Sequence, residues 1–201
     1  MEKPNSATRR RNAAATREAI LRSARAAFAR SGYDGAGVRE IAQGAGVTAM
    51  LVNRYFGSKE QLFAEVAAAT QAETTLLTDA VLNGPEAGRD MARALVGITA
   101  KGGAVLEGFE ITLRSAASER AAEIGREQIE KHKLAQLASV LRGEHSPQRA
   151  ALILSLVAGL QAMRQMIGLS ALNEVDPDVL VDLLAPILQQ LLDGAIPTET
   201  P

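Results

Sequence analysis

The stretch from Val38 to Phe56 constrains the fold of this chain more than any other segment. A small residue, Ala42, is followed by Gly46 and then by a short segment with helical spacing of its apolar residues. Ala42 allows two helices to cross closely, and Gly46 can take the positive φ that a tight turn between them requires. Thr48 carries a hydroxyl that can cap the second helix. The spacing therefore predicts a helix-turn-helix, with helices near residues 38–43 and 48–55.

The second of these helices carries the side chains that we expect to contact DNA. Its apolar residues have the spacing of one inward face, which leaves polar and small residues to enter a major groove. Asn53 can donate and accept hydrogen bonds on adenine, whereas Ala49 and Met50 can contact a thymine methyl group. Lys59 is better placed for a phosphate. The full set of expected DNA contacts is Arg39, Thr48, Ala49, Met50, Asn53, Arg54, Tyr55 and Lys59.

The charge distribution favours an anionic partner for the N-terminal part of the chain. Residues 1–62 carry 11 Lys and Arg against 5 Asp and Glu, whereas residues 63–201 carry 11 against 18. A basic segment on an acidic body is typical of a module that binds nucleic acid. The run Arg9, Arg10 and Arg11 suits the DNA backbone or minor groove, although it could also be a solvated tail. The alternative for the helical pair, a surface for protein contact, explains these charges less well.

Helical periodicity continues through the rest of the chain, and no segment shows the alternation of a β-strand. Turn residues such as Asn83-Gly84-Pro85 separate the helical segments. The sequence therefore predicts an all-α fold of about nine helices.

Two segments near the C-terminus contain more apolar residues than one buried stripe needs. One runs from Pro147 to about Leu169, and the other from Val179 to Leu192. Two such helices from each of two chains would form a four-helix interface, although burial within one monomer is the alternative. The expected interface residues are Leu152, Leu156, Leu160, Met163, Leu180, Leu184, Ile187 and Leu191.

A small-molecule site is harder to locate from the sequence. Phe109 is the only aromatic residue after Phe63, so a cage of rings for a planar cation is not expected. An aliphatic pocket would suit an apolar or acyl-like molecule, although the same residues could be ordinary core. The candidates for this pocket are Met91, Leu95, Ile98, Phe109, Leu113 and Met163.

The sequence gives little support for catalysis. It has no cysteine, and its two histidines, His132 and His145, lack partners at metal-ligand spacing, so no metal or cofactor is expected. No nucleophile elbow or phosphate loop is present. A helical enzyme or a protein-interaction module is therefore the less favoured alternative. The N-terminus lacks a signal-peptide pattern and the longest apolar run is too short to cross a bilayer, so we expect a cytoplasmic protein with no membrane partner.

An ordered set of residues runs through the segment from Thr16 to Phe63. The set consists of Thr16-Arg17, Ile20, Ala24, Phe28, Gly32-Tyr33, Val38-Arg39-Glu40-Ile41-Ala42, Ala45-Gly46-Val47-Thr48, Arg54-Tyr55-Phe56-Gly57-Ser58-Lys59-Glu60 and Leu62-Phe63. In this order it resembles the DNA-binding region of the tetracycline-repressor (TetR) family. Two departures are Gly37, where that family often has Thr, and Val52-Asn53, where it often has Leu-Tyr.

The resemblance implies a dimeric, all-helical regulator that binds a palindromic operator in double-stranded DNA. It also implies that a small molecule bound to the C-terminal domain releases the protein from the operator, so the expected function is ligand-responsive repression. On this basis we expect a flexible basic arm over residues 1–12, a helix-turn-helix domain over residues 13–60, and a ligand-binding and dimerisation domain over residues 61–201. The alternative is a constitutive DNA-binding protein without a ligand.

Overall fold

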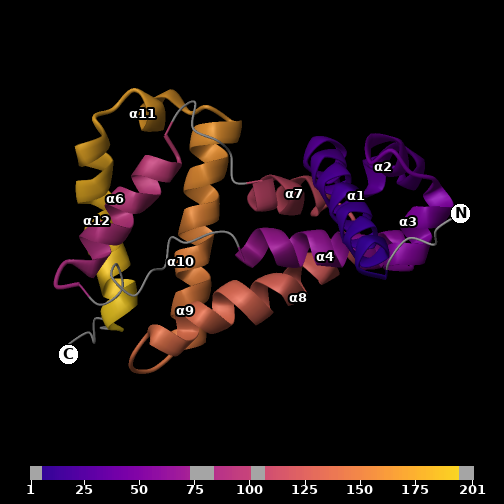
Figure 1. The fold of residues 1–201 in the computed structure, drawn as a ribbon. Coiled ribbons are helices and arrows are strands. Elements are labelled where there is room, and N and C mark those ends of the chain that lie inside the picture. Colours follow the sequence, from indigo (N-terminus) through magenta and orange to yellow (C-terminus); the bar gives the residue numbers. More distant parts are fainter. Residues whose placement is uncertain (1–5, 73–83, 101–106, 195–201) are drawn as a thin grey trace, which may run out of the picture. The chain divides into compact units, whose positions relative to one another are not determined.

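The computed structural model describes residues 6–72, 84–100 and 107–194, with side chains from residue 12 to residue 70 in the first range. Every regular element in these ranges is a helix, and they contain no strand (Figure 1). The expected all-α fold is therefore confirmed. None of the helices in the same ranges is long and apolar enough to cross a membrane.

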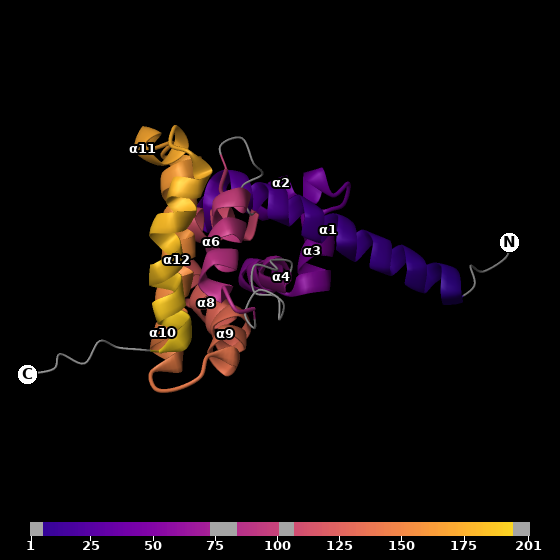
Figure 2. The same cartoon turned by 90° about the vertical axis from the view of Figure 1, so that its left-hand side faces the viewer.

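The chain divides into two compact units, which are described separately here. Unit 1 contains residues 1–72 and 107–128, and unit 2 contains residues 73–106 and 129–201. The helices of unit 1 are α1 (Ser6–Gly35), α2 (Val38–Gly44), α3 (Ala49–Phe56), α4 (Lys59–Ala72), α7 (Glu107–Ser115) and α8 (Glu119–Ile129) (Figures 1 and 2).

Unit 1 is larger than the helix-turn-helix domain that the sequence predicted, because three further helices share its core. Leu62 and Phe63 of α4, Ile111 of α7 and Ile124 of α8 are buried in one cluster with residues of α1, α2 and α3. The side chains of α4, α7 and α8 therefore add apolar surface to the core that α1, α2 and α3 share. The boundary of this unit therefore does not fall at residue 60.

The first helix starts earlier than the sequence predicted. Helix α1 begins at Ser6, so much of the expected flexible arm over residues 1–12 is helical. The extension includes Ala7, Arg9, Arg10 and Arg11, and alanine and arginine are among the best helix formers. The helical geometry is interrupted at Gly32, which has φ 64° and ψ −175°.

Position 32 requires glycine for two reasons: its φ is positive, and the backbone of Arg114 lies too close for a side chain. A Cβ atom at Gly32 would lie 2.5 Å from the carbonyl oxygen of Arg114 in α7. The next backbone N–H, that of Tyr33, donates a hydrogen bond of 3.0 Å to the buried Ser115 Oγ. The end of α1 is therefore held against the end of α7 by a close backbone approach and a hydrogen bond.

Three aromatic rings form the centre of this region. The Phe28 and Tyr33 rings are stacked with centroids 6.3 Å apart, and each packs edge-on against Phe63 at 5.1 Å. Such arrangements are favourable because the positive edge of one ring meets the negative face of another. The cluster fixes the corner between α1 and α4.

Unit 2 consists mainly of helices from the C-terminal half of the chain. They are α6 (Ala87–Ile98), η1 (Glu130–Leu134), α9 (Ala135–Val140), α10 (Ser146–Gln161), η2 (Ala162–Met166), α11 (Ser170–Asn173) and α12 (Pro177–Asp193). The single helix expected from residue 147 to about 169 changes to π-helical geometry in η2, where the Ile167 N–H bonds to the Ala162 carbonyl. A π-helical turn widens the helix by one residue.

In unit 2, α6 packs along α12 (Figure 1). Gly88 allows the two backbones to approach, because a Cβ atom there would lie 2.7 Å from the Ala185 carbonyl oxygen and from Gln189. The Gly88 N–H donates to Gln189 Oε1 at 2.7 Å. Met91, on the same helix, is buried in the core that α6 and α12 share.

Two buried arginines stabilise helix ends in unit 2. Arg149 donates to the carbonyls of Leu191 and Leu192 in the last turn of α12, at 2.8 and 3.1 Å. Arg164 donates to the Val96 carbonyl near the end of α6 at 2.7 Å, and burial lowers the pKa of its guanidinium. Both cations therefore bind helix C-termini, where unpaired carbonyls carry partial negative charge.

Candidate nucleic-acid interface

The predicted helix-turn-helix is present between α2 and α3. Gly46 has φ 67°, and the Val47 N–H bonds to the Ala42 carbonyl at 2.9 Å across the turn. Thr48 is the N-cap of α3, and its hydroxyl accepts a hydrogen bond from the Leu51 N–H at 3.3 Å. Gly46 and Thr48 therefore have the turn and capping geometry that the sequence predicts.

Helix α3 has one buried side and one exposed side. Val52 and Phe56 are buried against the core of unit 1, and Val47 packs partly against it. Met50 is 80% exposed, which is unusual for a large apolar side chain. Among the other expected contacts, Arg39, Thr48, Asn53 and Arg54 are exposed, and Ala49, Tyr55 and Lys59 are half-buried. The apolar underside therefore fixes a helix whose outer side is free to meet a partner.

Arg17, which is not among the expected DNA contacts, packs against the last residue of α3. The guanidinium of Arg17 in α1 lies 4.9 Å from the centroid of the Phe56 ring and forms an ion pair with Glu65 of α4. It therefore connects three helices around the last residue of α3. Arg17 is one of the residues that carry the family resemblance, but the sequence did not indicate this role, because both partners lie far along the chain.

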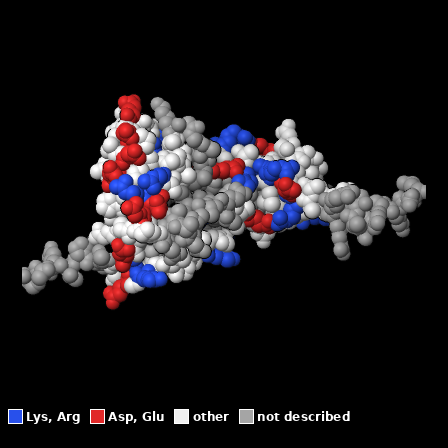
Figure 3. Space-filling model, turned by 60° about the vertical axis from the view of Figure 1, so that its left-hand side comes forward, with Lys and Arg blue, Asp and Glu red and all other residues white. Residues whose placement is uncertain are grey.

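The basic residues of unit 1 fall into two groups. On α1, Arg17, Arg22 and Arg30 form ion pairs with acidic side chains, and so does Arg25 with Glu107 of α7. The described residues provide no such acidic partner for the three cations near α3, which are Arg39, Arg54 and Lys59. Figure 3 shows one face of the molecule, on which acidic and basic side chains are interspersed. Positive charge left without an acidic neighbour is available to an external anion.

Lys59 has an aromatic neighbour instead of an acidic one. Its ammonium lies 4.5 Å from the centroid of the Tyr33 ring, a distance typical of a cation–π interaction. Burial raises the pKa of the Tyr33 phenol, and Glu60 and Asp34 raise it further. The ring therefore stays uncharged at neutral pH.

The expected basic arm contains three further arginines. The side chains of Arg9, Arg10 and Arg11 lie outside the described residues, and their contact with DNA remains a prediction.

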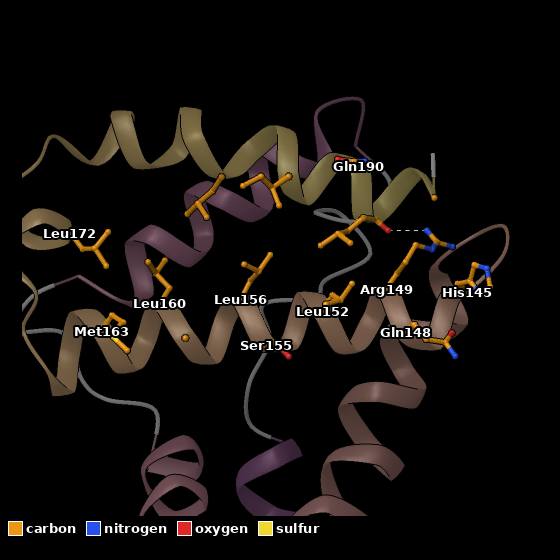
Figure 4. Close-up of a pocket in the computed structure, with 15 residues that line it drawn as sticks. His145, Gln148, Arg149, Leu152, Ser155, Leu156, Leu160, Met163, Leu172 and Gln190 are labelled. Carbon is orange, nitrogen blue, oxygen red and sulfur yellow. Dashed lines mark hydrogen bonds between the residues drawn. The ribbon is translucent and has the colours of Figure 1, made fainter. Parts of the chain in front are cut away.

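Unit 2 has an open apolar groove between α10 and α12 (Figure 4). Its volume is about 800 Å³, and apolar side chains from both helices, mainly leucines, contribute to its lining. Leu152 and Ile187 are 54% and 47% exposed within this groove. Single exposed apolar side chains are common, but a contiguous exposed apolar patch is typical of an interaction surface. Seven of the eight expected interface residues line the groove: Leu152, Leu156, Leu160, Met163, Leu184, Ile187 and Leu191.

The eighth expected interface residue, Leu180, does not line the groove. Leu180 is 6% exposed and belongs to the core between α6 and α12, so its place in the interface list is corrected. The reason is the helical period: Leu180 projects from the side of α12 that faces α6, whereas Val179 and Leu183, at 45% and 63% exposed, project outward.

The residues expected to line a ligand pocket divide between the two units. Met91 and Leu95 are buried and Ile98 is half-buried in unit 2, whereas Phe109 and Leu113 belong to unit 1. Met163 lines the apolar groove and is 44% exposed, and Leu113 is 43% exposed. The role of all six residues in ligand binding stays a prediction.

The turn at Gly46 and the capped helix α3 have the geometry of a helix-turn-helix, an element typical of DNA-binding proteins. Within the ranges that the structure covers, no three His, Asp or Glu side chains are grouped so that they could hold a metal ion.

Comparison with family models agrees with this assignment. Residues 20–66 match the model of bacterial regulatory proteins of the tetR family, and residues 86–192 match the model of the tetracyclin repressor-like C-terminal domain. The chain belongs to the TetR family. It is therefore a DNA-binding transcription regulator, and proteins of this family are generally not enzymes. Comparison with curated proteins found no match.

Solved structures with this fold come from several bacteria. A TetR-family regulator (SCO0857) from Streptomyces coelicolor A3 has 24% identity and a TM-score of 0.55, covering 96% of this chain and 98% of that one. A transcriptional regulator from Rhodococcus sp. Rha1 has 24% identity and a TM-score of 0.56, covering 90% and 99%. NalD, the secondary repressor of the MexAB-OprM multidrug efflux pump in Pseudomonas aeruginosa, has 20% identity and a TM-score of 0.60, covering 90% and 97%. At these identities the likeness concerns the fold.

Proposed function

We propose that this protein is a homodimeric repressor that binds a palindromic operator through α3 and is released by a small molecule. The observation that carries the proposal is the exposed side of α3, which presents Met50, Asn53 and Arg54. Two further cations are Arg39 of the preceding helix α2 and Lys59 of the following helix α4. None of these three cations has an acidic partner among the described residues. In this proposal the protein works in the cytoplasm, where bacterial DNA lies.

Base recognition in this proposal depends on Asn53. Its exposed amide can form two hydrogen bonds with adenine, so the Asn53→Ala variant should lose about 1–3 kcal/mol of preference at one operator position. Selection of bound sequences from random duplexes, followed by anisotropy titrations, measures this preference. Gln43→Ala, which removes an exposed amide from α2, is the matched control and should keep the wild-type preference. Equal weakening on all sequences by Asn53→Ala would contradict the assignment.

Phosphate binding depends on Lys59 and the other cations near α3. Loss of one phosphate contact lowers the slope of log K against log salt by about 0.9, and it weakens binding to all sequences alike. We expect this result for Lys59→Ala. Arg22→Ala removes a cation of α1 that is already paired with Glu18, so its slope should equal that of the wild type. An unchanged slope for Lys59→Ala would remove this residue from the interface.

The apolar groove between α10 and α12 is the proposed dimer interface, and its occupant is the same face of a second copy. A two-fold symmetric pair would place two helices from each chain together and would present two copies of α3 to half-sites about 34–36 Å apart. Dimerisation is typical of the TetR family, which supports this occupant. Ile187→Glu should give a monomer in analytical ultracentrifugation because it places a charge in the groove. Val140→Glu changes a similarly exposed residue outside the groove and should leave the dimer intact.

The effector in this proposal is a molecule with an apolar body and a hydrogen-bonding end. Met91 and Leu95 are buried apolar side chains of unit 2, and three buried polar atoms near η2 have no partner in the described part of the chain. They are Gln161 Nε2, Gln165 Oε1 and Asn173 Oδ1. Such atoms are normally satisfied by water or by a ligand. Repression, rather than activation, is favoured by the fold likeness to NalD, which is a repressor.

A panel of linear alkanes, alcohols, acids and amides tests the effector. A compound that binds only the folded protein must raise its melting temperature, and an effector must also release DNA in the anisotropy assay. If no compound does both, the alternative of a constitutive DNA-binding protein is favoured. Rigid aromatic cations should have no effect, and their tight binding would contradict the proposed ligand class.

A further inference from the structure

The contact between Lys59 and Tyr33 has a geometry that bears on DNA binding. The Lys59 ammonium lies 4.5 Å from the ring centroid of Tyr33, and no described acidic side chain competes for it. An ammonium has three N–H donors and the ring face occupies only one direction around it. The remaining donors can therefore bind a phosphate while the ring contact persists.

The ring of Tyr33 is itself fixed from two sides. It packs on Phe28 and Phe63 with centroids 6.3 and 5.1 Å away. Its backbone N–H donates to Ser115 Oγ at 3.0 Å, beside the close approach of Gly32 to the Arg114 carbonyl. The ring is therefore held by unit 1 and can hold the flexible lysine in turn.

We propose that Tyr33 is a positioning residue for DNA binding, because it holds the Lys59 ammonium where a duplex phosphate is bound. Lysine loses more rotamer freedom on ordering than most side chains. A lysine already ordered on a ring loses less of this freedom when DNA arrives, so binding is tighter. This inference rests on the proposed function of Lys59 as a phosphate contact.

The experiment is a double-mutant cycle between the two residues. The probe is a fluorescein-labelled duplex of about 30 base pairs with arbitrary sequence at low salt, because phosphate contacts govern non-specific binding. Tyr33→Leu should weaken binding roughly two- to fivefold, the worth of an exposed cation–π contact, whereas Tyr33→Phe should match the wild type. In the Lys59→Met background, Tyr33→Leu should have no further effect.

The outcomes separate this inference from the function on which it rests. If Lys59→Met leaves both affinity and salt slope unchanged, the phosphate contact itself is wrong. If Lys59→Met weakens binding but Tyr33→Leu has the same effect with and without the lysine, Tyr33 is only a structural residue. If Tyr33→Leu tightens binding, the ring withholds the lysine from DNA. The second and third results overturn only the positioning role.

A second variant covers the case in which Tyr33→Leu does not fold. Pentafluorophenylalanine at position 33 keeps a six-membered ring but reverses the charge distribution of its face. Compared with Tyr33→Phe, it should weaken binding by the same two- to fivefold, and only when Lys59 is present. Equal affinity of the two rings would overturn the proposal.

Discussion

The crossing of α6 and α12 allows a test in which one chemical change is made at two sites of one helix. Gly88 and Gly97 both lie in α6, and neither has a positive φ. A Cβ atom at Gly88 would lie 2.7 Å from the Ala185 carbonyl oxygen and from the Gln189 backbone nitrogen. At Gly97 a Cβ atom would have no neighbour within 4 Å. An alanine Cβ would therefore clash with the backbone of α12 at position 88, whereas at position 97 it would clash with nothing.

The expected effects have opposite signs. Alanine is more favourable than glycine in a helix by about 0.5–1 kcal/mol, so Gly97→Ala should stabilise the protein by up to this amount. At Gly88, restoring an ordinary contact of 3.4 Å requires α12 to move outward by about 0.7 Å. Overpacking of this kind costs about 1–3 kcal/mol, which exceeds the gain in helix propensity. Gly88→Ala should therefore be less stable than Gly97→Ala by about 1–3 kcal/mol.

Urea unfolding followed by circular dichroism at 222 nm measures this difference. All three proteins must be compared at one concentration, because dimerisation makes the midpoint depend on concentration. A change in midpoint at constant slope reports the free energy of unfolding. If Gly88→Ala is stabilised as much as Gly97→Ala, the backbones of α6 and α12 do not approach as described, and this account of unit 2 is refuted.

Three further predictions concern individual side chains. Gly37→Thr should stabilise the protein by about 0.5–1 kcal/mol in the same urea assay, because the N-cap of α2 has φ −90° and ψ 141° and open space around a Cβ atom. Arg164→Met should cost about 2–4 kcal/mol, because it leaves buried acceptors at the end of α6 without a donor. The hydrogen bond from Arg30, and then that from the Gly37 N–H, lower the pKa of Glu40. Its contribution to stability should therefore be present at neutral pH and lost as the pH falls through the lowered pKa, so the melting temperatures of wild type and Glu40→Gln should converge in acid.

The helix-turn-helix was predictable from sequence because its determinants are local. The positive φ of Gly46 and the hydrogen bond to Thr48 Oγ1 involve residues within one or two turns of each other. The exposure of Met50 and the burial of Val52 follow from the helical period. The apolar groove was also predictable, because Leu152 and Ile187 belong to stripes that are wider than one buried face needs.

Contacts between residues that are far apart along the chain were harder to predict from sequence. Nothing local indicates that Arg17 would contact Phe56 and Glu65, or that Arg164 would reach the Val96 carbonyl. The burial of Leu180 depended on which side of α12 meets α6, and a wide apolar stripe leaves that choice open.

By itself, the sequence determined the helices, the turn at Gly46 and the outward side of α3, because hydrogen bonds and side-chain periods within a few residues fix them. Only the tertiary structure decided that α7 and α8 share a core with the DNA-binding helices and that the Tyr33 ring meets Lys59. These contacts join segments that are distant in the chain, and the shapes of the packed surfaces select them from many apolar pairings that the sequence alone permits.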